Sequence, residues 1–189
     1  MEDLSAGLSS EGELHGVVVN HGTMGEVARI ADSTTAGWLH TFHVNLFSVV
    51  SIVQAALPAL RKSKGTIVFT SSGAAGNAYS GWGAYGASKS ALNHLAMTLK
   101  VEEVDVTTVS VRPGVVDSEM QREIREVHSR SGVMAEKDRI KFLEAYEKKT
   151  LLRPDQPGNV IAKLVVGAPR ELSGMFVSWN DEVLQDFQD

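Results

Sequence analysis

The sequence contains no cysteine and no surplus of positive charge. Because its 189 residues include no cysteine, a disulfide framework and thiolate metal ligands are excluded, and the cytoplasm is the default expectation for its compartment. The 18 Lys and Arg residues are outnumbered by 23 Asp and Glu residues, which gives a net charge of −5, and they form no basic stripe. We therefore expect neither a nucleic acid nor an anionic membrane surface as a partner.

Several motifs are also absent. Residues 1–7 have neither a positively charged start nor an apolar core, so they do not form a signal peptide, and no apolar run reaches membrane-spanning length. His40 and His43 share a helical spacing, but no carboxylate or cysteine completes a metal site, so we expect none. The G-x-S-x-G and S-x-x-K motifs of serine hydrolases are missing as well. A composition of 43% hydrophobic and 22% charged residues is typical of a soluble domain with one sizeable core.

Strand-like and helix-like stretches alternate along the chain. We expect strands near residues 16–20, 66–71, 106–111 and 175–179, and helices near 35–62, 83–101, 118–128, 135–148 and from about 155 onward. This alternation is typical of an α/β fold with a parallel sheet. No linker or repeat divides the chain, so we expect one domain, with the sheet and the chemistry in 14–117, a substrate lid in 118–150, and a C-terminal helix and strand in 151–189.

The predicted helix 35–62 is unusual because it has very little polar surface. A helix of this kind should be covered on more than one side. The cover can come from a partner helix or from the rest of the same domain, and both alternatives stay open. Pro58 is expected to kink this helix or to end it late.

The segment Tyr85-Gly-Ala-Ser-Lys89 lies within the predicted helix 83–101. Tyr85 and Lys89 are one turn apart and therefore project from the same face. At ~4 Å and an effective dielectric of ~20, an ammonium stabilises a phenolate by about 4 kcal/mol, or roughly three pK units, before desolvation opposes it. We therefore expect Lys89 to lower the pKa of Tyr85, so that the phenol can donate its proton to a carbonyl oxygen.

Ser72 follows the β-branched stretch 66–71, which is predicted to be a buried strand. Ligands of open α/β sheets bind at the carboxyl ends of the strands, so Ser72 is placed to hold a carbonyl oxygen beside the Tyr85 hydroxyl. Taken singly, a serine at a strand end and a tyrosine before a lysine on a solvated helix need no function. Their combination, in the order strand, small-residue loop and helix, favours carbonyl reduction.

Ser72, Tyr85 and Lys89 resemble the catalytic set of the short-chain dehydrogenases/reductases, and Asn45 matches the fourth member of that set. The resemblance implies a Rossmann-like, doubly wound parallel sheet and hydride transfer between a nicotinamide cofactor, NADP(H), and a small carbonyl substrate. It implies that Tyr85 is the acid, that Ser72 orients the carbonyl, and that Lys89 also binds the nicotinamide ribose. Asn45 is implied to anchor a water that links Lys89 to solvent.

Two more segments resemble the cofactor-binding elements of this family. Asn20-His-Gly22 is similar to an Asn-Ala-Gly element that stabilises the sheet beside the adenosine half of the cofactor, with His21 in place of the alanine. The loop after Arg112 is similar to the Pro-Gly loop that covers the nicotinamide. The residues of that loop implied to hold the cofactor are Pro113, Gly114, Val116 and Ser118, with the Val116 backbone on the carboxamide.

The segments 82–94, 115–120 and 174–181 are similar to those of fungal benzil reductases that form (S)-benzoin. This likeness implies a ketone or an α-dicarbonyl as substrate. In the family, the helices that correspond to 35–62 and 83–101 form a four-helix dimer interface, which implies a homo-oligomer.

The strand, Gly-rich turn and helix with which this family begins have no counterpart here. Only 16 residues precede Val17, whereas two βαβ crossovers that share a strand need on the order of 60 residues. We therefore expect a partial sheet that lacks its first strands. The pattern G-x-G-x-x-G at residues 81–86 is not a substitute, because a loop separates it from its strand and Tyr85 within it already has a chemical role.

Together these features predict an NADP-dependent reductase of a ketone or an α-dicarbonyl. Tyr79, Trp82 and the region 118–148 are expected to form the walls of its substrate pocket. The alternative is a non-catalytic interaction protein that binds no cofactor and pairs with other chains through its helices. Binding of NADPH distinguishes the two.

Overall fold

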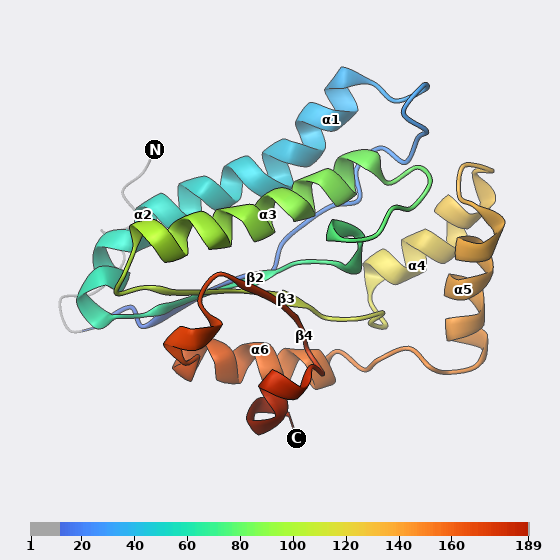
Figure 1. Cartoon of the computed structure of the whole chain (residues 1–189). Helices are drawn as coiled ribbons and strands as arrows, with labels where there is room; N and C mark the ends of the chain where they lie inside the picture. Colours follow the sequence, from blue (N-terminus) through green and yellow to red (C-terminus); the bar gives the residue numbers. More distant parts are fainter. Residues whose placement is uncertain (1–11, 189) are drawn as a thin grey trace.

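Four parallel strands form the centre of the molecule (Figure 1). In the computed structural model, which describes residues 12–188, they follow the spatial order β1-β2-β3-β4. The strands are β1 (Gly16–Val19), β2 (Thr66–Thr70), β3 (Thr107–Arg112) and β4 (Met175–Ser178). Each strand pairs in parallel with the next one along the chain, so all their carboxyl ends lie at one edge. The predicted α/β fold with a parallel sheet is confirmed.

The two inner strands are buried on both faces. Ile67, Val68 and Phe69 of β2 and Val109 and Val111 of β3 are all 0% exposed. Runs rich in β-branched residues suit this position, because strands of a parallel sheet pack against helices on both sides.

One face of the sheet is covered by α1 (Thr35–Phe42), α2 (Ser48–Ser63) and α3 (Gly83–Glu102), which lie above it in Figure 1. A π-helical turn, η2 (His43–Phe47), joins α1 to α2, so the predicted helix is one long element with a widened turn. Pro58 lies inside α2 and does not end it. The marked irregularity of this helix is at η2, and Asn45 belongs to that turn.

This layer and the sheet enclose the first core cluster. It takes Val49, Val53, Ala56 and Leu60 from α2, Leu92, Ala96 and Leu99 from α3, and Val19, Ile67 and Phe69 from the strands. This packing of α2 and α3 against the strands sets the position of α3 relative to the end of β2. The predicted catalytic side chains meet there.

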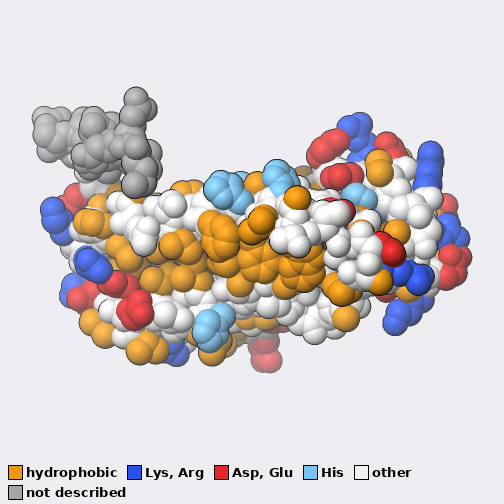
Figure 2. Space-filling view, turned by 90° about the horizontal axis from the view of Figure 1, so that it is seen from above, with side chains coloured by type: hydrophobic (Ala, Val, Ile, Leu, Met, Phe, Trp, Pro, Cys, Tyr) orange, Lys and Arg blue, Asp and Glu red, His pale blue; other side chains and the backbone are white. Residues whose placement is uncertain are grey.

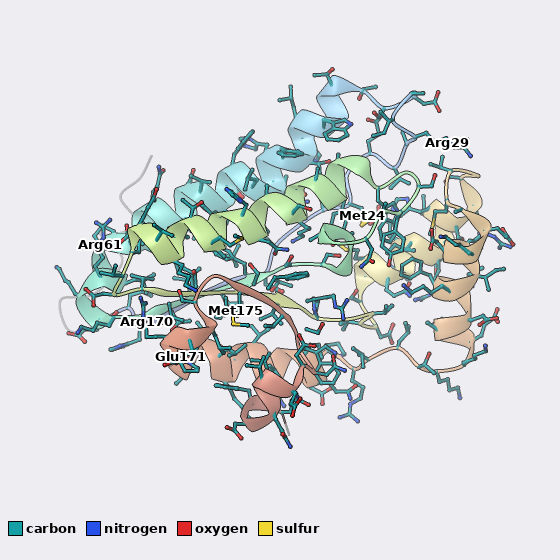
Figure 3. The ribbon with its side chains drawn as sticks, in the orientation of Figure 1. Met24, Arg29, Arg61, Arg170, Glu171 and Met175 are labelled. Carbon is teal, nitrogen blue, oxygen red and sulfur yellow. The ribbon has the colours of Figure 1, made fainter. Side chains whose placement is uncertain are left out.

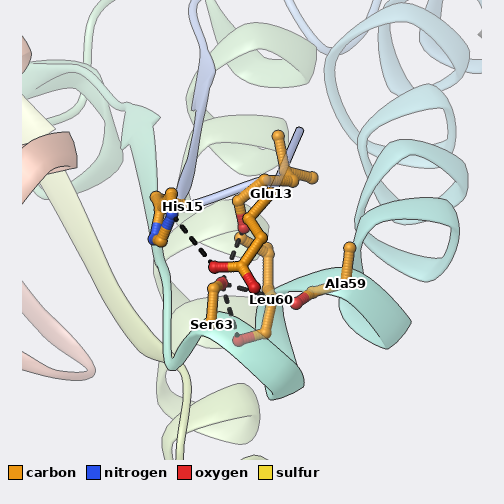
Figure 4. Close-up of polar contacts among 6 residues, drawn as sticks. Glu13, His15, Ala59, Leu60 and Ser63 are labelled. Atoms are coloured by element: carbon orange, nitrogen blue, oxygen red, sulfur yellow. Dashed lines mark hydrogen bonds and ion pairs between the residues drawn. The ribbon is translucent and has the colours of Figure 1, made fainter. Parts of the chain in front are cut away.

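Polar contacts fasten the start of the sheet to the end of α2. The Ser63 hydroxyl donates to the Leu14 carbonyl oxygen at 2.6 Å (Figure 4), and the Thr66 amide donates to the His15 carbonyl oxygen at 3.0 Å. Nearby, Arg61, labelled in Figure 3, pairs with Glu103 through two hydrogen bonds of 2.6 and 2.8 Å. These contacts lie at the opposite end of the strands from the predicted site.

The opposite face of the sheet is covered by α6 (Asp155–Gly167). Val160, Ile161 and Leu164 of this helix pack into a second core cluster with Val68 and Val177. Two 3₁₀ turns, η5 (Arg170–Leu172) and η6 (Glu182–Phe187), flank β4. The sheet is therefore covered on both faces.

The segment predicted as a lid forms two helices beyond the carboxyl edge of the sheet. These are α4 (Glu119–Glu126) and α5 (Glu136–Glu147), with the 3₁₀ turn η4 (His128–Arg130) between them. A third cluster joins them to α3 and to the 3₁₀ turn η3 (Gly73–Ala75). Its buried members are Met24, Ala74, Trp82, Tyr85, Ile124, Met134 and Phe142.

The helix from Thr35 to Ser63 is long and apolar enough to cross a membrane, by length and composition alone. This corrects the expectation that no apolar stretch reaches that length. The same helix contributes Val49 and Val53 to the core, and it carries the fully buried Asn45. Core helices of soluble proteins pass the same test of length and composition, so the finding is weak support for a membrane span.

Candidate active site

A cavity of about 840 Å³ opens at the carboxyl edge of the sheet, next to the ends of β1, β2 and β3. Ser72, Tyr85 and Lys89 line it. So do all the other residues that were predicted to hold the cofactor, namely Asn20, Gly22, Pro113, Gly114, Val116 and Ser118. Asn45 is not part of the lining. The structure thus brings two separately predicted sets of residues into one cavity.

Tyr85 and Lys89 share one face of α3, as their spacing predicted. Both side chains are buried, with exposed fractions of 6% and 3%. The Lys89 ammonium donates a hydrogen bond to the Thr70 carbonyl oxygen at 2.8 Å and lies 6.0 Å from the centre of the Tyr85 ring. Lys89 therefore connects the face of α3 that bears Tyr85 to the end of β2.

Ser72 lies just after β2 and caps the short turn η3, where its hydroxyl oxygen accepts from the Ala74 amide at 3.1 Å. The same hydroxyl interacts with the Tyr85 phenol and lowers the pKa of that phenol. The Tyr85 hydroxyl also approaches the Met120 sulfur at 3.9 Å, from the first turn of α4. The segment after β2, the helix α3 and the first turn of α4 therefore meet at the Tyr85 hydroxyl.

The pKa of Tyr85 differs from the sequence-based expectation. Burial raises it above its ordinary value, and the interaction with Ser72 only partly opposes this effect. Lys89 does not reverse the direction, because its ammonium is turned toward Thr70. Burial also lowers the pKa of Lys89, to about 8. The expected lowering of the Tyr85 pKa by Lys89 is thus wrong for this arrangement, and the phenol is held in its protonated form.

Asn45 is fully buried in the π-helical turn η2, and its side-chain amide makes three hydrogen bonds. Its Oδ1 accepts from the Thr23 amide at 2.8 Å, and its Nδ2 donates to the Thr23 carbonyl oxygen at 2.9 Å and to Ser88 Oγ at 3.0 Å. Ser88 in turn donates to the Tyr85 carbonyl oxygen at 2.7 Å. Asn45 therefore joins the loop after β1 to the turn of α3 that bears Tyr85.

Gly22 lies close to these groups. A Cβ atom at this position would be 3.2 Å from Lys89 Nζ and 3.3 Å from Asn45 Oδ1. The adjacent His21 is exposed, and its ring nitrogen Nε2 is 2.8 Å from Ser48 Oγ on α2. The histidine in place of alanine is therefore accommodated on the helix side, while the glycine faces the lysine.

The loop after β3 is held by contacts that need a glycine. Gly114 has φ +82°, and a Cβ there would be 2.6 Å from Leu152 Cδ1. Val116 bridges to Leu152. Ser118 caps α4 by accepting from the Gln121 amide at 3.3 Å, which leaves its hydroxyl proton free to donate.

An aromatic wall covers one side of the cavity. Tyr79 and Trp82, both predicted as pocket walls, have ring centres 4.7 Å apart, and Phe142 of α5 lies 5.3 Å from Trp82 and 6.0 Å from Tyr79. Lys141 donates to the Tyr79 hydroxyl at 3.1 Å. Sequence reasoning named the region that contains Phe142 but not the residue, because nothing in the local pattern shows which face of α5 turns inward.

The three glycines of the pattern at 81–86 have structural causes. A Cβ at Gly81 would be 2.6 Å from Val133, one at Gly83 would be 2.7 Å from Ile30, and one at Gly86 would be 2.9 Å from the Ala74 carbonyl oxygen. Protein atoms, rather than open space for a phosphate, therefore lie beside each glycine. In the part of the chain that the structure describes, no group of three or more His, Cys, Asp or Glu side chains could hold a metal ion.

A family model described as short chain dehydrogenase matches residues 2–129. The chain belongs to this family. In this short-chain dehydrogenase the predicted serine, tyrosine and lysine line one cavity, and the resemblance seen in the sequence is confirmed at the level of the family.

Two similar proteins come from Saccharomyces cerevisiae. The chain is 43% identical over 186 residues to a benzil reductase ((S)-benzoin forming) of Saccharomyces cerevisiae, covering 94% of this chain and 70% of that protein. The crystal structure of another short chain dehydrogenase/reductase from the same yeast matches with a TM-score of 0.94 at 39% identity, covering 98% of this chain and 73% of that one. This short-chain dehydrogenase is therefore shorter than its relatives, and the predicted partial sheet is confirmed.

Two further solved structures are similar to the chain. A short chain dehydrogenase from Shigella flexneri complexed with NADP matches with a TM-score of 0.68 at 25% identity, covering 89% of this chain and 64% of that one. A cytoplasmic protein with unknown function from Saccharomyces cerevisiae matches with a TM-score of 0.72 at 34% identity, covering 98% and 73%.

Proposed function

We propose that this short-chain dehydrogenase is an NADPH-dependent carbonyl reductase that converts a ketone or an α-dicarbonyl into an alcohol. The observation that carries the proposal is the convergence of Ser72, Tyr85 and Lys89 on one cavity, with the phenol buried beside the serine hydroxyl. The benzil reductase among its relatives supports an α-dicarbonyl as substrate, and the NADP complex of another relative supports the cofactor.

The residues around Lys89 fit the nicotinamide half of the cofactor. An ammonium has three donors, and Lys89 uses one of them on Thr70, which leaves donors for the hydroxyls of a ribose. Gly22 has no Cβ to stand between such a ribose and the ammonium. The loop that contains Pro113, Gly114 and Val116 would hold the carboxamide. NADPH, when bound here, supplies the hydride that reduces the carbonyl carbon.

The side chains supply the proton and the orientation. Tyr85 donates its proton to the carbonyl oxygen, and Ser72 holds that oxygen beside the phenol. The positive charge of Lys89 stabilises the phenolate that remains after the transfer. One hydride and one proton together turn the C=O group into CH–OH. The raised pKa of Tyr85 suits this direction, because the acid must be protonated before the reaction.

Asn45 acts through other groups. Its hydrogen bonds to Thr23 and Ser88 hold the Gly22 loop against α3, so it fixes the distance between the ribose site and Tyr85. We propose it as a positioning residue. The water relay implied by the family resemblance would use the space beside Lys89, next to Gly22.

The direct test is a titration of the purified chain with NADPH, followed by nicotinamide fluorescence. Addition of the aryl diketone phenylpropanedione then measures turnover through the loss of absorbance of NADPH. The proposal requires saturable binding at millimolar cofactor or below, and consumption of NADPH that depends on the diketone. Binding without any turnover of diketones or ketones would contradict it.

A second candidate is a non-catalytic interaction protein. The observation that favours it is an exposed apolar face on α1–α3, which includes Leu39, Phe47, Met97 and Val101 at exposed fractions of 59%, 48%, 52% and 77%. Figure 2 shows hydrophobic side chains gathered along this side of the molecule. No saturation with NADPH at millimolar concentration would favour this second reading over the reductase.

The same face supports a homo-oligomer under either reading. Two copies that pack their α1–α3 faces together would cover the apolar side of the long helix that its own domain leaves exposed. We propose such a pairing through the helices at 35–62 and 83–101. We also propose that the chain resides in the cytoplasm, because a similar yeast protein is described as cytoplasmic.

A further inference from the structure

Within residues 12–188, three residues that line the cavity have a buried side-chain polar atom without a hydrogen-bond partner. They are Gln121, at both Oε1 and Nε2, Trp82 at the indole Nε1, and Thr70 at Oγ1. Gln121 and Trp82 are the two whose unpaired atoms include an N–H donor. Both residues line the cavity, and only 3% of Gln121 and 6% of Trp82 is exposed. Buried polar groups are nearly always paired, so an unpaired amide and an unpaired indole at the same cavity call for a partner.

The local sequence offers Gln121 a partner that it does not use. Ser118 is the N-cap of α4 and Gln121 is its third residue, which is the spacing of a capping box. One half of the box is formed, because Ser118 Oγ accepts from the Gln121 amide at 3.3 Å. The return bond from the Gln121 side chain to the Ser118 amide is not made. Gln121 thus gives up a local bond and is buried at the cavity instead.

Both groups belong to segments that contact the proposed acid, Tyr85. The ring of Trp82 meets the Tyr85 ring edge to face, with their centres 6.0 Å apart. Met120, the neighbour of Gln121 in the first turn of α4, brings its sulfur within 3.9 Å of the Tyr85 hydroxyl. The indole N–H and the amide therefore come from the two elements that flank the site where a carbonyl would be protonated.

We propose that Gln121 and Trp82 form a subsite for a second oxygen atom of the substrate, adjacent to the carbonyl that is reduced. The indole Nε1 and the amide Nε2 are both donors, and a carbonyl oxygen has two lone pairs with which to accept from them. The substrate class is accordingly an α-dicarbonyl rather than a simple ketone. The inference rests on the proposed reductase function, and it adds the residues that select the substrate.

The wall beside this subsite fits an aryl group. Tyr79, Trp82 and Phe142 present rings whose centres are 4.7 to 6.0 Å apart, which is the range of favourable aromatic pairs. An aryl diketone would place its ring against this wall and its distal oxygen on the two donors. A ketone of the same shape without that oxygen would leave the donors unpaired.

Two conservative variants test the subsite by binding alone. Gln121→Met keeps the length of the side chain without its amide, and Trp82→Phe keeps an aromatic ring without the N–H. The probes are phenylpropanedione and the two ketones that each lack one of its oxygens, propiophenone and phenylacetone. Affinities are measured by calorimetry on the full chain, with thermal unfolding to establish that each variant is folded.

The wild-type chain should bind the diketone at least about 10-fold more tightly than either ketone, because two hydrogen bonds are gained. Each variant should lose about 3- to 10-fold in affinity for the diketone and less than about 2-fold for the ketone that lacks the oxygen held by the subsite. Gln54→Met and Trp38→Phe, whose side chains do not line the cavity, should leave all affinities unchanged.

Equal affinity of the wild type for diketone and ketones, or unchanged discrimination in both variants, would overturn the inference. Unchanged discrimination in both variants would mean that ordered water alone pairs the Gln121 amide and the Trp82 indole. The outcome is separate from the proposed function. If the diketone preference depends on Gln121 and Trp82 but NADPH is never consumed, the subsite stands as a binding site and the reductase proposal fails.

Discussion

The ammonium of Lys89 lies 6.0 Å from the centre of the Tyr85 ring and donates its hydrogen bond to the Thr70 carbonyl oxygen instead of to the phenol. The two groups share a helix face and a cavity, and burial shifts the pKa of each. The pKa of Tyr85 is raised and that of Lys89 is lowered to about 8. Burial thus favours the protonated form of Tyr85 and disfavours the charged form of Lys89.

The stability of the chain should rise between pH 8 and pH 10, because of Lys89. Its pKa falls from 10.5 in the unfolded chain to about 8 in the folded one, so in this range the unfolded state binds more protons, and stability increases with pH. The full effect is about 3 kcal/mol, since one pK unit is worth about 1.4 kcal/mol. Tyr85, whose pKa is raised from 10.0, begins to oppose the rise only above that value.

Urea unfolding at a series of pH values measures this effect. The rise should disappear in Lys89→Met and persist in Lys100→Met, a matched change of an exposed lysine on the same helix. A wild-type curve that runs parallel to that of Lys89→Met would show that Lys89 titrates normally in the folded chain.

Replacement of Asn45 by alanine should destabilise the chain by about 2–4 kcal/mol. The change removes three hydrogen bonds and leaves the amide and carbonyl of Thr23 without these partners. Chemical denaturation measures the loss, with Asn77→Ala as the control, because Asn77 is exposed and donates only to Gly73. A cost for Asn45→Ala no larger than that of the control would contradict its role in joining the Gly22 loop to α3.

Gly22→Ala should weaken cofactor binding more than it weakens the fold. The added methyl group would lie 3.2 Å from Lys89 Nζ, at the place proposed for the ribose. We expect a fall of about 10-fold or more in NADPH affinity, corresponding to roughly 1.4 kcal/mol. Gly76→Ala is the matched control, because a Cβ there meets nothing within 4 Å. Equal NADPH affinities for the two variants would place the ribose elsewhere.

The apolar face of α1–α3 should be an interface between copies of the chain. Light scattering coupled to size exclusion should give a mass of two or more chains for the wild type, and a shift toward the monomer for Phe47→Glu and Met97→Glu. Val166→Glu on α6 is the control, because Val166 is 85% exposed on the other face of the sheet. A wild type that is monomeric at all concentrations would rule out this pairing.

Local patterns predicted the parts of this fold that follow from periodicity. The β-branched run at 66–71 predicted the buried strand β2, and the spacing of Tyr85 and Lys89 placed both side chains on one face of α3. Patterns could not show where a long side chain turns. Lys89 reaches Thr70, far away in sequence, and this contact together with burial decides the pKa values.

Local patterns also fail to predict the position of the Gln121 side chain and the widened turn of the helix that contains Asn45. The residues from Ser118 to Gln121 have the spacing of a complete capping box, and only tertiary packing leaves the Gln121 side chain at the cavity. Pro58 is the expected irregularity of the long helix, whereas the widened turn is at η2, where buried Asn45 bonds to Thr23 and Ser88. Bonds between distant segments set both features.

Replacement of Tyr85 by phenylalanine tests the central claim most directly. The measurement is the initial rate of NADPH oxidation with phenylpropanedione, beside the thermal midpoint and NADPH affinity of each protein. The account predicts that Tyr85→Phe loses at least about 100-fold in rate, the lower bound for a general acid, while it still folds and binds NADPH. Tyr146→Phe, at an exposed tyrosine outside the cavity, should keep the full rate. Turnover by Tyr85→Phe at the wild-type rate would contradict the account.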